Sequence, residues 1–351
     1  MSRNSLRINC HRCAVTWRPM SERRKAPGRN ERNGITLFEL FKMFPTDEAA
    51  EQWLIERRWP NRIACVSCGS VNVQTGAKHR TMPFRCREKG CAKKFSIRTG
   101  TVMEASNLGY QTWVFAIYIV TTSLKGVSSM KLHRDLGISQ KSAWFVLHRL
   151  REAMRGEDFL MCGPVEADET YVGGLEKNKH KDKKMKAAGG PVGKAIVAGV
   201  KDRCSNRVSA RVVPDTKAAT LTRLVADHVE PGTEVFTDEA RGYLPLSRMG
   251  FDHASVKHSV GQYVDGMAHT NGMESFWSLL KRGYHGTYHQ MSYEHLHRYV
   301  AEFQHRHNER PKDTIDQMAG MVKQMDGRRL SYEQLIAQGP RAVKRLEEIA
   351  A

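Results

Sequence analysis

The chain has 351 residues, of which 40% are hydrophobic and 26% charged, and its formal net charge is +19. This length favours two or three domains, and the hydrophobic content supports packed cores rather than a disordered chain. No run of about 18 uncharged apolar residues occurs, and the basic N-terminus lacks an apolar signal core. We therefore expect no membrane span and no secretion, and predict a cytoplasmic protein.

The positive charge is concentrated in the first half of the chain. Residues 1–160 contain 28 Lys or Arg against 13 Asp or Glu, whereas residues 161–351 contain 28 against 24. A basic half suits a polyanion, and nucleic acid is the usual one. A basic surface that is merely solvated is the alternative. The asymmetry predicts a first half that binds nucleic acid and a second half that carries out the chemistry.

The first 60 residues predict a tail followed by helices. Residues 1–33 hold nine Lys or Arg and little apolar periodicity, so we expect a disordered basic tail. In it Cys10 and Cys13 form a lone pair, which cannot complete a tetrahedral metal site. In residues 34–60, Pro45 separates two short helices, and Asp47 is the candidate N-cap of the second. The apolar residues of the first helix share one face: Leu37, Leu40, Phe41 and Phe44.

Residues 61–100 contain four cysteines at the spacing of a zinc ribbon. Two residues separate Cys65 from Cys68, four separate Cys86 from Cys91, and 17 lie between the pairs. Four thiolates suit tetrahedral Zn²⁺ and leave no open position, which predicts a structural metal that supplies folding energy. Four unrelated buried thiols are the alternative. Basic residues around the pairs predict a DNA-facing surface: Lys78, Arg80, Arg85, Arg87, Lys93, Lys94 and Arg98.

Residues 101–160 predict a helical segment that includes a helix-turn-helix. Gly137 would end the first helix, and Ser139 would cap a basic second helix. This arrangement is typical of a DNA-reading unit, although an ordinary helical hairpin has the same local pattern. The candidate DNA contacts, mostly to phosphate, are Lys141, Ser142, Arg149 and Arg151.

Three acidic residues in the second half are candidates for a metal site. Asp168 lies within an apolar strand-like run, Asp238 follows a second strand, and Glu274 lies on a predicted helix. A carboxylate in a buried strand is costly unless it is paired or bound to metal. Carboxylates from two strands and a helix could hold two Mg²⁺ ions for in-line phosphoryl transfer. Taken singly, each acid could instead be a paired strand carboxylate, a cap or a surface residue.

The predicted helix around Glu274 carries its polar residues on one face. These residues recur at helical spacing: Asn271, Glu274, Ser278 and Lys281. Lys281, two turns beyond Glu274, could contact substrate phosphate. Of the histidines around Glu274, His269 is the best candidate for a DNA or structural contact.

Three motifs, DETYVGG, TDEARGY and HTNGMESFWSLLKRG, together resemble the DDE transposases of bacterial insertion sequences. More narrowly, they resemble the branch that pairs an N-terminal zinc ribbon with this catalytic domain, over roughly residues 40–335. The resemblance implies a ribonuclease H-like fold and assigns catalytic Mg²⁺ or Mn²⁺ to Asp168, Asp238 and Glu274. The 35 residues between Asp238 and Glu274, and Lys281 seven residues later, match the family pattern. Because some members use Asn as the third ligand, Asn271 could join or replace Glu274.

These observations predict an α/β protein in which a zinc ribbon and a helix-turn-helix-like segment precede a ribonuclease H-like catalytic domain. The resemblance implies a transposase that cleaves element ends and transfers the freed strand, as a homo-oligomer on double-stranded DNA. The alternatives are a metal-dependent nuclease that never joins and a non-catalytic zinc-ribbon DNA-binding regulator. We expect six segments: 1–33 (basic tail), 34–60 (short helices), 61–100 (zinc ribbon), 101–160 (helical DNA-binding segment), 161–300 (catalytic domain) and 301–351 (C-terminal helical extension).

Overall fold

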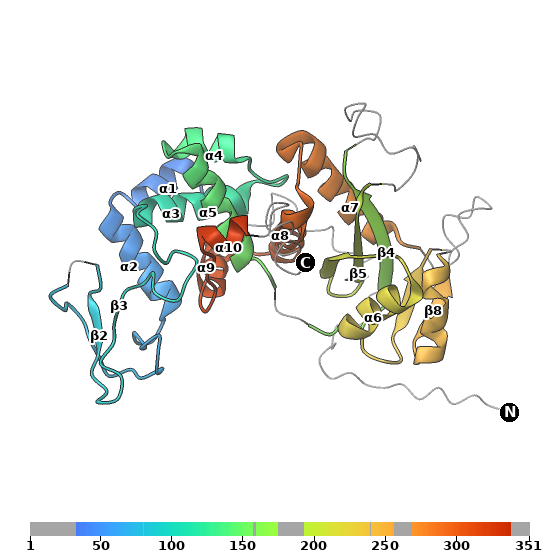
Figure 1. Cartoon of the computed structure of the whole chain (residues 1–351), viewed down its shortest axis with the longest axis horizontal. Coiled ribbons are helices and arrows are strands. Elements are labelled where there is room, and N and C mark those ends of the chain that lie inside the picture. The colour runs from blue at the N-terminus through green and yellow to red at the C-terminus, as the bar shows by residue number, and fades with distance from the viewer. Residues whose placement is uncertain are drawn as a thin grey trace, which may run out of the picture. The chain divides into compact units, whose positions relative to one another are not determined.

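A computed structural model of the chain describes residues 33–79, 81–156, 159–174, 193–238, 240–255 and 269–337. The predicted tail, apart from its last residue, therefore lies outside the described residues. The chain folds as two compact units (Figure 1). The helical unit comprises the described residues up to Gly156 and from Arg282 onward, and the sheet unit comprises residues 159 through Lys281. None of the described helices is long and apolar enough to span a membrane.

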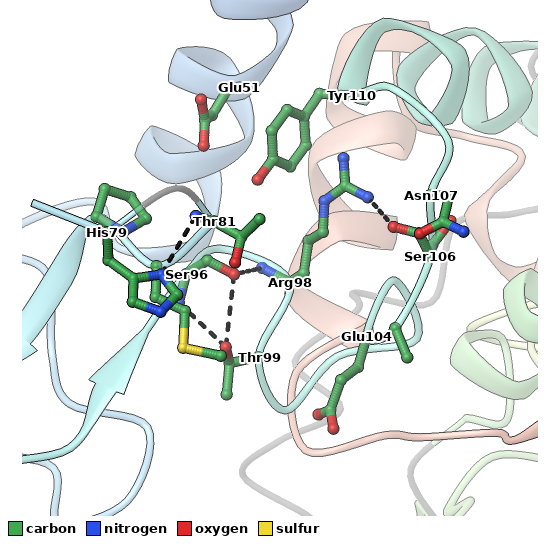
Figure 2. Close-up of a pocket in the computed structure, with 13 residues that line it drawn as sticks. Glu51, His79, Thr81, Ser96, Arg98, Thr99, Glu104, Ser106, Asn107 and Tyr110 are labelled. Carbon is green, nitrogen blue, oxygen red and sulfur yellow. Dashed lines mark hydrogen bonds between the residues drawn. The ribbon is translucent and has the colours of Figure 1, made fainter.

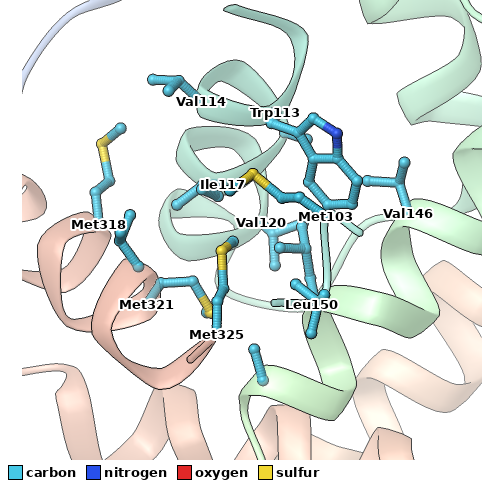
Figure 3. Close-up of a cluster of buried hydrophobic side chains, with 14 of the residues drawn as sticks. Met103, Trp113, Val114, Ile117, Val120, Val146, Leu150, Met318, Met321 and Met325 are labelled. Atoms are coloured by element: carbon cyan, nitrogen blue, oxygen red, sulfur yellow. The ribbon is translucent and has the colours of Figure 1, made fainter. Parts of the chain in front are cut away.

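Helices from both ends of the chain build the helical unit. The helices are α1 (Leu37–Met43), α2 (Asp47–Arg58), α3 (Tyr110–Thr122), α4 (Ser129–Leu136), α5 (Gln140–Ala153), the π-helix η6 (Tyr284–Tyr288), α8 (Tyr293–Glu309), α9 (Thr314–Gln324) and α10 (Tyr332–Ile336). In their shared core, Ile117 of α3 lies on the side of three methionines of the α9 region, Met318, Met321 and Met325 (Figure 3). Trp113 of α3 lies beside Met103 and Val146 in the same core. Burial of these apolar side chains is the main term that holds distant segments together.

The first two helices follow the predicted break at Pro45, with one correction. Thr46, not Asp47, is the N-cap of α2, because its hydroxyl accepts a hydrogen bond from the Ala49 amide. Asp47 is the first helical residue, and its carboxylate accepts the amide of Gln111 at 2.9 Å. On α1 only Leu40 is buried, whereas Leu37 and Phe41 are each 56% exposed.

The two helices and the intervening turn predicted in residues 101–160 are present, which fits both a helix-turn-helix and an ordinary helical hairpin. Helix α4 ends at Gly137, whose φ of 63° lies in the left-handed region that glycine adopts without strain. Ser139 caps α5, because its hydroxyl accepts the backbone N–H of Ser142. The turn is therefore encoded by two local residues.

The ribbon is a small antiparallel sheet of β1 (Val73–Gln74), β2 (Phe84–Cys86) and β3 (Lys94–Phe95), in the order β1-β2-β3. Trp59, which follows α2, packs its ring edge-on against Phe84 and Phe95 at centroid distances of 5.8 and 6.1 Å. This aromatic contact attaches the ribbon to the helices.

The sheet unit contains one mixed five-stranded sheet. In chain order its elements are β4 (Val165–Val172), β5 (Ala195–Asp202), β6 (Val208–Val213), α6 (Ala218–His228), β7 (Glu234–Thr237), the 3₁₀ helix η4 (Arg241–Met249), β8 (Asp252–Ser255) and α7 (Asn271–Gly283). The strand order is β6-β5-β4-β7-β8. Strands β6, β5 and β4 pair antiparallel, whereas β4, β7 and β8 pair parallel. The predicted mixed α/β architecture is thereby confirmed.

Both faces of the central strands are covered. Val165 and Ala167 of β4 and Ala198 and Val200 of β5 pack with α6 and η4 in one core. The alternating residues face the other way, where Gly199 lies so close to α7 that an added Cβ would be 2.9 Å from Met273 and 3.0 Å from Trp277. Helix α7 therefore lies directly on the face of the sheet that carries Asp168.

Candidate active site and metal centre

Strand β4 presents acidic residues on both faces of the sheet. Asp168 pairs across the ladder with Gly199 of β5, on the face covered by α7. Its neighbour Glu169 points to the opposite face, where it accepts a hydrogen bond at 3.0 Å from the fully buried hydroxyl of Tyr243. Strand alternation therefore gives these two adjacent carboxylates different surroundings.

Asp238 follows β7, which is the parallel neighbour of β4. The register pairs Glu166 with Phe236, so its continuation by two residues brings Asp168 opposite Asp238. The Ala240 amide donates to Asp238 Oδ1 at 3.0 Å and holds this carboxylate at the strand end. The two predicted aspartates thus lie on adjacent strands at the same level of the sheet.

The surroundings of Asp168 disfavour its negative charge. Burial, and then the charges of Asp238 and Glu169, raise the pKa of Asp168 to about 7. Two donors act in the opposite direction: the Trp277 indole N–H lies 3.0 Å from Oδ2, and the Glu169 amide lies 2.8 Å from Oδ1. Burial and Asp238 also raise the pKa of Glu169. A divalent cation would neutralise these crowded carboxylates, and its preferred ligands are such oxygens.

Glu274 lies in the first turn of α7 with its side chain exposed, and its amide donates to the carbonyl of Thr270 at 3.0 Å. The predicted polar face is confirmed, because all four of its residues are exposed: Asn271, Glu274, Ser278 and Lys281. Within the described residues, however, the only group of three or more metal-ligating side chains within 4.8 Å of one another is a cysteine cluster. The strand register brings Asp168 and Asp238 to adjacent positions, but Asp168, Asp238 and Glu274 do not form a group within that distance.

Two residues of this region were missed in the sequence. Trp277 donates to Asp168 from α7, and Glu166 accepts hydrogen bonds from α7 and from Arg203. The available signal was position, since Glu166 shares the strand face of Asp168 and Trp277 lies one turn beyond Glu274. His269, expected to make a DNA or structural contact, makes a structural one with Arg203.

The four ribbon cysteines form the predicted cluster. Their sulfur atoms lie within 4.8 Å of one another, with Cys65 and Cys91 3.7 Å apart and Cys68 and Cys86 3.6 Å apart. A tetrahedron with Zn–S bonds of about 2.3 Å has edges of about 3.8 Å, so the cluster fits Zn²⁺ closely. The first knuckle is closed by the Gly69 amide, which donates to the Cys65 carbonyl at 2.8 Å.

Of the four candidate DNA contacts on α5, two are wrong. Arg149 and Arg151 are only 5% and 2% exposed. Arg149 donates to the carbonyl of Leu330, and Arg151 pairs with the buried Glu302 at 2.7 Å. Lys141 is exposed, with its ammonium 4.5 Å from the ring centroid of Tyr332, and Ser142 is half-buried near the start of the helix. Only these two remain accessible to DNA.

A hollow of about 780 Å³ separates the ribbon from α2 and α3 (Figure 2). Arg98 stacks 4.2 Å from the Tyr110 ring centroid and donates to the Ser106 carbonyl, so it is engaged inside the hollow. Two carboxylates, Glu51 and Glu104, also line it and disfavour a phosphate there. Other predicted basic residues of the ribbon are exposed: Lys78, Arg85, Arg87, Lys93 and Lys94. Arg80 lies outside the described residues.

Comparison with known proteins relates the second half of the chain to one family. The model of the ISXO2-like transposase domain matches residues 161–308. This match includes all four predicted catalytic positions: Asp168, Asp238, Glu274 and Lys281.

Two curated relatives extend the similarity. A protein in the transposable element ISH50 of Halobacterium salinarum is 31% identical over 254 residues, which cover 69% of this chain and 84% of the relative. A transposase-like protein of Haemophilus influenzae is 30% identical over 119 residues, or 34% of this chain and 93% of the relative. A chain from the structure of the simian T-cell lymphotropic virus intasome with PP2A regulatory subunit B56 gamma is 14% identical, with 55% of this chain and 65% of that chain covered. Its TM-score of 0.25 is too low for an argument about the fold.

Proposed function

The chain belongs to the ISXO2-like family of insertion-sequence DDE transposases, and we propose that it cleaves the ends of such an element and transfers the freed strand to target DNA. The observation that carries this proposal is the Asp168–Asp238 pair. Two carboxylates on adjacent parallel strands, one with its pKa raised to about 7, form a centre of negative charge suited to a divalent cation.

We propose that Asp168, Asp238 and Glu274 hold the catalytic Mg²⁺ or Mn²⁺. When bound, such ions activate the attacking oxygen and stabilise the leaving oxygen of a phosphoryl transfer. The protein's own groups orient this centre: Trp277 fixes one oxygen of Asp168, and the Ala240 amide fixes one oxygen of Asp238. Lys281, exposed on the same helix face as Glu274, would contact substrate phosphate. Asn271 lies on that face too and is the alternative third ligand.

The ribonuclease H-like assignment of residues 161–300 also remains a proposal. Its support is the mixed sheet, in which the central strand β4 and its parallel neighbour β7 each lead to one aspartate. The remaining predicted segments are proposals as well. The described part of the predicted extension 301–351 includes α9, which packs in the core of the helical unit.

We propose that the helical unit docks double-stranded DNA. Zn²⁺ held by the four cysteines would fold the ribbon, whose exposed lysines and arginines would contact phosphate. Lys141 and Ser142 at the start of α5 would contribute further contacts, because the first turn of a recognition helix is the part that reaches DNA. The active assembly on DNA would be a homo-oligomer.

The test compares variants of the full chain in end cleavage, strand transfer and gel-shift binding. Asp168→Asn and Asp238→Asn should each lower cleavage and joining at least a thousandfold while DNA binding persists, because metal-assisted charge stabilisation is worth several kcal/mol. Near-normal cleavage by either variant would end the proposal, because these carboxylates would then not hold the catalytic metal. DNA binding by the wild type without any cleavage would favour a non-catalytic DNA-binding regulator. Cleavage by the wild type without any joining would identify a nuclease instead. A larger loss in Asn271→Ala than in Glu274→Gln would move the third ligand to Asn271.

A further inference from the structure

The start of α7 is held to the sheet by a buried carboxylate that no step above uses. Glu166 lies two residues before Asp168 on β4 and is 2% exposed. One of its oxygens accepts the backbone N–H of Met273 at 2.9 Å, in the first turn of α7. That amide is one of the donors that a helix leaves unpaired at its N-terminus, so Glu166 acts as a cap supplied by the sheet.

Three further side chains complete this arrangement: Lys201, Arg203 and His269. We call these three residues together with Glu166 the clamp. Arg203 donates to the other oxygen of Glu166 at 2.8 Å and to the carbonyl of His269. Lys201 lies 3.4 Å from the carbonyl of Gly272. The clamp thus contacts the backbone N–H of Met273 and the backbone carbonyls of His269 and Gly272, all shortly before Glu274.

The clamp and Trp277 together fix the register of α7 along β4. Glu166 contacts Met273, and Asp168 contacts Trp277. The two strand residues are two positions apart, or about 6.6 Å, and the two helix residues are four positions apart, or about 6 Å. Because these spacings agree, both contacts form at once only in one register. Glu274 lies between the two helix contacts.

Gly272 shows how tightly the clamp fits. A Cβ at this position would lie 2.7 Å from Glu166 Oε2 and 2.8 Å from Lys201 Nζ. Any larger residue must therefore displace the clamp, although alanine itself favours a helix over glycine by about 1 kcal/mol. The absence of a side chain at 272 is a requirement of the contact.

We propose that Glu166, through the clamp, is a positioning residue that sets the place of Glu274 relative to Asp168 and Asp238. This inference rests on the proposed metal-dependent function of those acids. Mg²⁺ tolerates little deviation from octahedral geometry, so a displaced Glu274 weakens metal binding more than DNA binding. Partners that orient metal ligands typically contribute tenfold to a hundredfold in metal affinity or activity.

The experiment perturbs the clamp from both sides in the full chain. Glu166→Gln removes its charge, and Gly272→Ala inserts a methyl group against it. Each should raise the Mg²⁺ concentration for half-maximal end cleavage about tenfold or more, with unchanged gel-shift binding. Each should also weaken Mn²⁺ binding measured by calorimetry without DNA, and speed hydrogen exchange at the amides of Met273 and Glu274.

Asp202→Asn is the matched control. Asp202 is a buried carboxylate of β5 that accepts the amides of Cys204 and Ser205 at 2.7 and 3.0 Å. Its loss should lower thermal stability while leaving the Mg²⁺ midpoint within about twofold of the wild type, well below the range for ligand-orienting partners. Wild-type Mg²⁺ midpoints in both clamp variants, or an equal shift in the control, would overturn the positioning role. Failure of Asp168→Asn to stop cleavage would instead refute the underlying function.

Discussion

Replacement of Asp168 by asparagine should stabilise the metal-free protein while it destroys activity. The pKa of this carboxyl rises from 3.8 to about 7 on folding, so ionised Asp168 opposes the folded state. A difference of about three pKa units corresponds to at most about 4 kcal/mol. Because Asp168 is partly exposed, solvent screening reduces this, and we expect about 2 kcal/mol, or roughly 5 °C in the melting temperature.

The sign of the pH dependence follows from the same shift. Below about pH 4 the group is protonated in both states and asparagine mimics it, so the variant has no advantage. Between pH 4 and pH 7 the unfolded state releases its proton first, and the wild type loses stability as the pH rises. The advantage of asparagine should therefore grow across this window and stay constant above pH 7.

The assay is thermal unfolding of both proteins at pH 5 and pH 8, with and without 10 mM Mn²⁺, an amount of roughly the order needed to saturate weak carboxylate sites. Mn²⁺ should stabilise the wild type, chiefly at pH 8, and should have little effect on Asp168→Asn. Asp252→Asn, an exposed acid on β8 of the same sheet, should change neither property. A stability difference that does not vary with pH, or an asparagine variant less stable than the wild type at pH 8, would refute the reasoning.

Four further predictions concern other contacts. Cys68→Ser should release about one Zn²⁺ per chain and unfold the ribbon but leave the melting of the sheet unit unchanged, and full zinc content by metal analysis would contradict the site. Lys141→Ala should weaken DNA binding and reduce the slope of log affinity against log salt by about one. Arg151→Ala should instead lower the free energy of unfolding by about 3–5 kcal/mol, because Glu302 stays buried without this partner. Trp277→Phe removes a hydrogen-bond donor that lowers the pKa of Asp168, so the acidic limb of the cleavage pH profile should move to higher pH. An unmoved limb would show that the ionisation of Asp168 does not control the pH dependence of cleavage.

Local chemistry explains which features could be predicted from the sequence. Gly137 and Ser139 define their turn by backbone preference and hydroxyl capping, and the cysteine pairs define their cluster by spacing. Asp168 and Asp238 were identifiable because each polar residue interrupts or follows an apolar strand. Their adjacency needed only the parallel register of β4 and β7.

The errors arose where the deciding partner lies far away in sequence. Arg151 on a basic helix resembles a DNA contact until Glu302, 151 residues later, neutralises it in the interior. Arg149 likewise donates to a carbonyl 181 residues away. A helical pattern shows which residues share a face but not which faces another segment covers, so exposure of these arginines could not be derived locally. The role of Glu166 was hidden for the same reason, since its partner Met273 is 107 residues away.

The placement of α7 leads to a final prediction about Glu274. Contacts to β4 at Met273 and Trp277 bracket the turn that carries it, so this turn cannot approach the aspartates without breaking a hydrogen bond to Glu166 or Asp168. Closure of Glu274 on a shared metal must then come from rotation of its side chain. Glu274→Asp, shorter by one methylene but equally charged, should therefore lose Mn²⁺ affinity and cleavage nearly as fully as Glu274→Gln, with unchanged hydrogen exchange at Met273. Calorimetry and cleavage assays measure both. If the aspartate variant keeps near-normal metal affinity, then α7 moves to compensate, and the fixed register inferred from the two contacts is wrong.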